Sequence, residues 1–165
     1  HNIIDLIKAF ELFKKRNQNN LKFLFVIQIL DRGYFFEIKE YINDKNLKNE
    51  ILIFNNLETK YLVNLYKYSK LYLFSSYNEV FGLPSLEAMS QGCPVMVSKR
   101  SALKEVNGKA AEYFDPDNVL EITNKIEKIL FQKKIKKKLK KESEKHIKKF
   151  DWNITVNKTI QVLLN

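Results

Sequence analysis

The sequence has few of the residues that mark several classes of protein. One cysteine, Cys93, excludes a disulfide framework and a cysteine-rich metal site, and it favours a reducing compartment. The two histidines, His1 and His146, lie far apart, so no cluster of metal ligands is apparent. No apolar run reaches the roughly 18 residues of a membrane-spanning helix. No G-x-G-x-x-G follows an apolar strand, which argues against a dinucleotide-dependent oxidoreductase.

The length of 165 residues and the ordinary apolar share of 45% fit one globular domain. No signal peptide is apparent. Because the chain begins with His1 and not with Met, we expect it to be a piece of a longer protein.

The formal net charge of +10 is unevenly distributed. Lys133–Lys149 holds ten lysines and two glutamates, and the remainder is close to neutral. This pattern indicates a nearly neutral domain with one basic helix, and not a uniformly basic nucleic-acid binder. The helix could contact a membrane surface. Its thin apolar stripe, which Ser143 interrupts, favours a solvated helix face instead.

Apolar residues alternate between helical and strand patterns along the chain. The run Phe23–Ile29 is typical of a strand that is buried on both faces. Further strands are predicted at 51–54, 71–75, 94–98 and 111–114, and helices at 3–13, 35–47, 58–69, 85–91, 119–131, 133–150 and 154–164. This alternation predicts a single Rossmann-like α/β domain over residues 1–165, with a mainly parallel sheet between layers of helices.

The stretch SSYNEVFGLPSLEAMSQGCP, residues 75–94, holds two of the four glycines and two of the three prolines. It follows a predicted strand at the carboxyl edge of the sheet, where ligands of such folds bind. Pro84 suits the first position of a helix, and Gly92 suits its left-handed end. The N-terminus of this helix offers N–H groups and a positive dipole end to a phosphate.

Two carboxylates flank this turn. Gly82 permits close approach of the backbone to a ligand, and Glu79 and Glu87 can border one pocket and accept hydrogen bonds from sugar hydroxyls. Simpler interpretations are a solvated loop charge for Glu79 and a dipole-favoured acid in the first helical turn for Glu87. From these residues alone, the prediction is a phosphate-containing ligand, with a sugar nucleotide as one candidate.

The segment SSYNEVFGLPSLEAMSQGCPV resembles the family 4 (group 1) retaining glycosyltransferases of GT-B fold. In that family the donor-binding half carries a loop like E-G-F-G-L-P followed by L-E-A-M-x-x-G-x-P-V, and the spacing of Glu79 and Glu87 matches its E-x7-E element. IIDLIKAF, SALKEV, AAEYFDPDN and FDW are similar to other family segments in the same order. The resemblance implies a C-terminal donor-binding domain whose N-terminal acceptor-binding partner domain is absent.

The resemblance also implies roles for particular residues. Glu87 would hold the ribose hydroxyls of a nucleotide diphosphate sugar, and Glu79 would be the catalytic or sugar-orienting carboxylate. Backbone N–H groups of Phe81, Gly82 and Leu83 would contact sugar hydroxyls and phosphate. Neither a metal nor another cofactor is expected. The implied reaction is hexosyl transfer to a glycan or a lipid-linked acceptor, which the N-terminal domain would bind, in surface polysaccharide or glycolipid synthesis. The resemblance also implies a cytoplasmic location, and a peripheral position at the inner face of the membrane is compatible with it.

The sequence departs from the family pattern at several positions. Val80 and Asn55 stand where glycine is common, Gln28 stands where a glycine-rich turn is usual, and Lys104 replaces a usual proline. The family's phosphate-clamping Arg and Lys would lie upstream of His1, so we expect the isolated domain not to catalyse alone. The alternative function is a basic α/β binding module for a membrane surface or nucleic acid, with a vestigial nucleotide pocket. Aromatic residues do not interleave with the lysines, which argues against nucleic acid.

Overall fold

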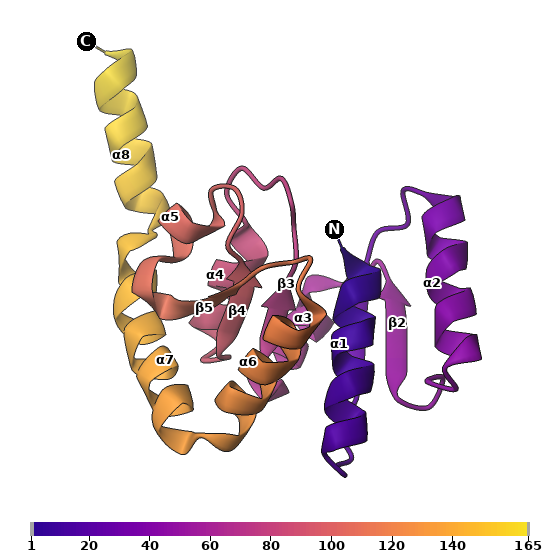
Figure 1. Ribbon diagram of the computed structural model, residues 1–165. Coiled ribbons are helices and arrows are strands. Elements are labelled where there is room, and N and C mark those ends of the chain that lie inside the picture. Colours follow the sequence, from indigo (N-terminus) through magenta and orange to yellow (C-terminus); the bar gives the residue numbers. More distant parts are fainter. Residues whose placement is uncertain (1, 165) are drawn as a thin grey trace.

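Strands and helices alternate along residues 2–164, the part of the chain that the computed structural model describes (Figure 1). The strands are β1 (Phe23–Ile27), β2 (Ile51–Asn55), β3 (Tyr72–Phe74), β4 (Val95–Ser98) and β5 (Ala111–Phe114). The helices are α1 (Ile3–Arg16), α2 (Arg32–Asp44), α3 (Thr59–Tyr68), α4 (Leu83–Ser90), α5 (Leu103–Asn107), α6 (Val119–Phe131), α7 (Lys133–His146) and α8 (Trp152–Leu163), with 3-10 turns at Gly108–Ala110 and Ile147–Lys149. This order confirms the predicted α/β fold.

The strands pair in parallel, as predicted, but they form two separate hydrogen-bonded groups. β1 pairs with β2 from Phe23 opposite Ile51 onward. β3, β4 and β5 form the second group, in that order, and Tyr72 lies opposite Val95. The pattern of apolar residues did not indicate this division between β1 and β3.

Helices cover both faces of the strands. One core cluster joins buried residues of α1, α2 and α6, among them Ile7, Ile38 and Ile122. The hydroxyl of Thr123 in α6 donates to the carbonyl oxygen of Ala9 in α1 over 3.1 Å, which ties two of these helices together. A second cluster on the opposite side joins α3, α4 and α5. The two clusters are the layers of a doubly wound α/β fold.

The basic helix α7 is partly built into the domain. Leu139 and Ser143 are buried, and the Ser143 hydroxyl donates to the carbonyl oxygen of Ala110. Ser143 therefore interrupts the apolar stripe because it bonds inward. Beyond α7, Asp151 caps α8, an exposed helix that projects from the rest of the molecule (Figure 1). Among the described helices, none is long and apolar enough to cross a bilayer.

The prediction that Phe23–Ile29 is buried on both faces is wrong. The strand ends at Ile27, and the side chains of Leu24 and Val26 are 36% and 38% exposed. Phe25, on the opposite face, packs into the core with α1 and α2. A continuous apolar run indicates that a strand can be buried on both faces. Whether the strand is buried depends on the elements that pack beside it, which the run itself does not reveal.

Candidate functional site

The loop that follows β3 lies at the carboxyl edge of the strands, where the sequence placed the candidate site. Its first residue, Ser75, is fixed to the start of α1, because the Asn2 N–H donates to the Ser75 carbonyl oxygen over 3.3 Å and the Ser75 hydroxyl donates to the Asn2 carbonyl oxygen over 3.2 Å. The loop then runs to Gly82 and enters α4.

Gly82 is the residue on which this turn depends. Its φ of +80° lies in the left-handed region, and a Cβ added there would approach Leu103 Cδ2 to 2.5 Å. Ser85, one turn into α4, places its hydroxyl 2.7 Å from both the Gly82 carbonyl oxygen and Asn107 Oδ1. Leu103, Ser85 and Asn107 are all fully buried, so the packing of α5 fixes where α4 begins.

The first turn of α4 has no side-chain cap. Leu83 is its first residue, so Pro84 takes the second helical position and not the first position that the sequence predicted. Pro84 has no N–H, and the Ser85 N–H donates to the Gly82 carbonyl oxygen over 3.0 Å. The helix thus presents its positive dipole end, with the Leu83 N–H, at the carboxyl edge.

Glu79 folds back on its own loop. Its Oε1 accepts hydrogen bonds from the N–H groups of Val80 and Phe81, at 3.1 and 3.4 Å. These N–H groups therefore converge on one anionic oxygen. Val80 is 90% exposed and does not have a positive φ, so this loop does not need the glycine that the family commonly has there.

Glu87 is held by a residue that sequence reasoning missed. The buried phenol of Tyr66, in α3, donates to Glu87 Oε2 over 3.2 Å. Burial, reinforced by the Glu87 charge, raises the pKa of the Tyr66 phenol, so this hydroxyl remains a donor. Tyr66 also packs edge-on against Tyr72 of β3, with ring centroids 5.4 Å apart. The contact joins residues 21 positions apart, and no local signal indicates it.

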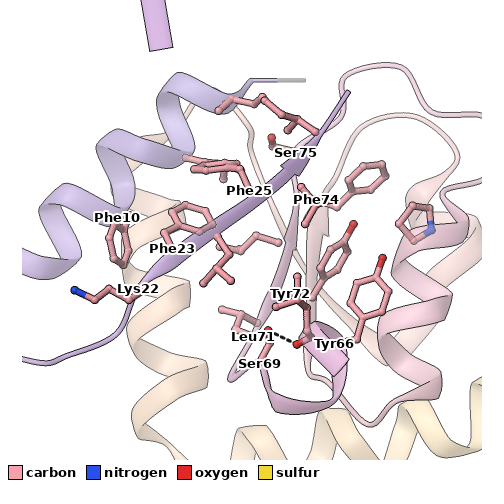
Figure 2. Close-up of a pocket in the computed structure, with 18 of the residues that line it drawn as sticks. Phe10, Lys22, Phe23, Phe25, Tyr66, Ser69, Leu71, Tyr72, Phe74 and Ser75 are labelled. Atoms are coloured by element: carbon pink, nitrogen blue, oxygen red, sulfur yellow. Dashed lines mark hydrogen bonds between the residues drawn. The ribbon is translucent and has the colours of Figure 1, made fainter. Parts of the chain in front are cut away.

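Glu79 and Glu87 line the same cavity, which has a volume of about 1080 Å³. The cavity extends from these carboxylates between β1 and β3, and Figure 2 shows Tyr66, Tyr72 and Phe74 on one side of it. Gln28, at the end of β1, also lines it. Asn55 does not line this cavity; it ends β2, and the next residue, Asn56, adopts the left-handed conformation with a φ of 54°.

A second polar group at the carboxyl edge went unnoticed in the sequence. Asp117 accepts hydrogen bonds from the Tyr77 hydroxyl and from Arg100, and the Arg100 guanidinium stacks 5.0 Å from the Tyr77 ring centroid. The bond to Asp117 raises the pKa of Tyr77. Lys99 pairs with Asp115 at 2.8 Å and holds the pKa of that carboxyl below its usual range. Both cations after β4 are therefore neutralised by carboxylates after β5.

Residues 2–164 contain no group of three or more His, Cys, Asp or Glu side chains that could hold a metal ion. His146 has a structural contact, since its Nε2 lies 2.7 Å from the Val106 carbonyl oxygen, and His1 lies outside the described residues. Cys93 is buried, and burial raises the pKa of its thiol to about 11, so the reactive thiolate is scarce.

Comparison with known proteins shows the family. The profile of the family described as glycosyl transferases group 1 matches residues 1–146. The chain belongs to the group 1 glycosyl transferases. It is 36% identical over 100 residues to the serotype-specific mannosyltransferase WbdA of Escherichia coli, a match that covers 61% of this chain and 12% of WbdA.

Two solved glycosyltransferase structures share the fold of this chain. The C-terminal domain of a group 1 family protein, LpcC of Francisella tularensis, superposes with a TM-score of 0.73 at 20% identity, over 88% of this chain and 76% of that one. HepE of Anabaena, solved in complex with UDP and glucose, superposes with a TM-score of 0.81 at 19% identity, over 96% of this chain and 43% of that one. The chain thus has the fold of a glycosyltransferase C-terminal domain, as the resemblance predicted, and it spans a small part of WbdA and less than half of HepE.

We expect Gly82→Ala to destabilise this transferase domain by more than Gly92→Ala. Both glycines have positive φ, at +80° and +72°, so each substitution carries the left-handed penalty of about 1–2 kcal/mol. Only at Gly82 does the new Cβ meet Leu103; a Cβ at Gly92 meets nothing within 4 Å. The overlap adds about 1–3 kcal/mol. Urea unfolding of both variants measures the difference, and equal losses would show that Leu103 does not constrain the turn.

Proposed function

We propose that this chain is the donor-binding half of a retaining glycosyltransferase, and that it binds a nucleotide diphosphate sugar at the carboxyl edge of the strands. The supporting observation is that Glu79, Glu87 and Pro84, in the first turn of the uncapped helix α4, line one cavity. A diphosphate suits the N–H groups and the dipole of α4, and carboxylates suit ribose and sugar hydroxyls. The bound UDP and glucose of the structurally similar HepE are consistent with this choice.

The proposed reaction exchanges one bond at the anomeric carbon of the donor sugar. The bond from this carbon to the diphosphate oxygen breaks, and its electron pair leaves with the nucleoside diphosphate. An acceptor hydroxyl oxygen bonds to the same carbon on the same face, and its proton passes to the departing diphosphate. The N–H groups of Phe81, Gly82 and Leu83, with the α4 dipole, stabilise the charge that develops on the leaving group. No metal is required in this scheme.

Each carboxylate has a distinct part in the proposal. Glu87, which Tyr66 holds at 3.2 Å, binds the ribose hydroxyls. Glu79 lies against the donor sugar, and it must release the Phe81 N–H before that group can bind the donor. The acceptor is a glycan or a lipid-linked glycan, bound by a further domain, and the full-length protein works in surface polysaccharide or glycolipid synthesis. The mannosyltransferase activity named for WbdA makes a hexose the first donor sugar to test.

The alternative, a basic module for a membrane surface or nucleic acid, has weaker support. The residues of α7 that are buried, Leu139 and Ser143, face the domain, so its outer face is lined with lysines. Insertion into a bilayer interface requires an exposed apolar face, which α7 does not present. A module of this kind would show no saturable nucleotide binding.

We expect the full-length protein to bind UDP, GDP or ADP saturably, and Glu87→Ala to weaken this binding about tenfold or more. Charge-assisted hydrogen bonds such as those from ribose hydroxyls to a carboxylate contribute about 1.5–3 kcal/mol each. We expect a smaller loss of affinity for Tyr66→Phe, because this variant keeps the Glu87 carboxylate and removes only the hydroxyl that orients it. Calorimetric titration measures all three proteins.

Glu58→Ala provides the matched control, because it removes an exposed glutamate that does not line the cavity. Its nucleotide affinity should equal that of the unmodified protein. If none of the three nucleotides binds, the donor-domain proposal is wrong; if Glu87→Ala binds normally with its fold intact, the ribose role is wrong.

We expect Glu79→Gln to lower turnover in the full-length enzyme while nucleoside diphosphate affinity stays within about threefold. A contact that strengthens as charge develops on the sugar lowers the barrier without tightening ground-state binding. In the free protein the Glu79 carboxylate accepts a hydrogen bond from the Phe81 N–H of its own loop. In this proposal it contacts the sugar and not the nucleoside diphosphate, so its replacement removes no contact with the nucleotide. Turnover and affinity are measured on one preparation. Near-normal turnover would show that Glu79 is only a solvated charge in the loop. Equal losses of turnover and affinity would show that it is a binding residue.

A further inference from the structure

Two phenylalanine rings join the loop after β3 to the link between α7 and α8. The Phe81 ring lies edge-on to the Phe150 ring, with centroids 6.0 Å apart and an interplanar angle of 84°. Edge-to-face pairs are favourable at this distance, and one such pair shifts an equilibrium by about two- to tenfold. Phe81 belongs to the loop that carries the candidate N–H groups, so the contact reaches the candidate site from a distant part of the sequence.

Phe150 is itself attached to a fixed part of the domain. Its ring packs against the His146 ring, with centroids 5.3 Å apart, and its N–H donates to the Ile147 carbonyl oxygen over 3.0 Å. His146 Nε2 lies 2.7 Å from the Val106 carbonyl oxygen in α5, and a Cβ added at Gly108 would lie 3.3 Å from the His146 ring. Figure 1 shows the link between α7 and α8 beside α5. The position of Phe150 is therefore set by α5 through His146.

The loop that carries Phe81 is held less firmly. Leu103 of α5 restricts the loop at Gly82, where a Cβ would not fit. Before that point, Val80 is 90% exposed. The Phe81 N–H donates to Glu79 Oε1 over 3.4 Å, a long distance for a hydrogen bond. The contact of the Phe81 ring with Phe150 therefore adds a restraint where the backbone has few.

The proposed function makes this restraint important during the reaction. Glu79 has to turn from the Phe81 N–H toward the donor sugar, and this movement breaks the hydrogen bond between them. N–H groups that stabilise a leaving group must already be in place when its charge develops. The contact between the Phe81 and Phe150 rings does not involve Glu79, so it persists after the carboxylate has moved.

Neither ring has a role in the core. Phe81 and Phe150 are 42% and 37% exposed, and both lie outside the two core clusters. Nor does Phe150 cap α8, since Asp151 accepts the hydrogen bonds from the first N–H groups of that helix. The loss of the Phe150 ring therefore leaves both the core and the cap of α8 in place, so its effect on the loop can be measured separately.

We propose that Phe150 is a positioning residue that holds the Phe81 ring and thereby keeps the Phe81 and Gly82 N–H groups directed at the leaving diphosphate. This inference rests on the proposed function. Loss of the Phe150 ring raises the barrier to sugar transfer more than it weakens donor binding, because the N–H groups act mainly on charge that develops in the transition state. The two phenylalanines act as one unit, since Phe150 has its effect only through Phe81.

Steady-state kinetics of the full-length protein test the kinetic part of the proposal. We expect Phe150→Leu to lower kcat by about two- to tenfold and to change the donor KM less than kcat. Phe150→Tyr, which keeps the ring, retains kcat, and so does the control Phe36→Leu, at an exposed phenylalanine of α2. The double variant Phe81→Leu with Phe150→Leu loses no more than Phe81→Leu alone. An unchanged kcat in Phe150→Leu, or losses that multiply in the double variant, would overturn the proposal.

Backbone amide relaxation, measured by NMR on the same proteins without donor, tests the structural part. We expect order parameters of about 0.85 for the Phe81 and Gly82 amides in the unmodified protein and in Phe150→Tyr, and of about 0.6 or lower in Phe150→Leu. If these values do not fall in Phe150→Leu, the proposal is wrong. If only the amides of α8 lose order, Phe150 serves α8 alone and the proposal is equally wrong. An unmodified protein that transfers no sugar contradicts the proposed function instead, and the order parameters, which need no donor, still decide whether Phe150 holds the loop.

Discussion

Gly82 turns the chain from the loop after β3 into α4 in a left-handed conformation, with Leu103 of α5 so close that no side chain fits between them. The positions of the other candidate groups follow from this contact. Phe81 and Leu83 flank the turn, Glu79 reaches back to the Phe81 N–H, and Glu87 lies one turn into the helix that Gly82 begins. A buried, close-packed turn of this kind holds N–H groups in place before any anion arrives, which is what stabilisation of a leaving group requires.

The charge of the molecule is arranged around this edge in a way that composition alone does not reveal. The excess of lysines lies on the outer face of α7, and Lys99 and Arg100 at the carboxyl edge are paired with Asp115 and Asp117. An anionic donor would therefore meet backbone N–H groups and a helix dipole more than free cations.

Sequence reasoning recovered the features that local patterns encode. The order of strands and helices followed from the alternating periods, and the glycine and proline positions located the turn at Gly82 and the left-handed end of α4 at Gly92. Contacts between residues that are far apart in the sequence could not be predicted from local patterns. Tyr66 and Glu87 meet only because α3 packs on α4, and Tyr77 meets Arg100 and Asp117 only because three strand ends lie side by side. The exposure of Leu24 and Val26 likewise depends on what lies beside β1.

A crystal structure of the full-length protein with a bound nucleotide diphosphate sugar tests the donor-domain account most directly. The account predicts the diphosphate at the N-terminus of α4, within hydrogen-bond distance of the Leu83 N–H, the ribose hydroxyls on Glu87, and Glu79 turned from the Phe81 N–H toward the sugar. A nucleotide bound elsewhere, with Glu79 still on its own loop and Glu87 without a ribose, would contradict it.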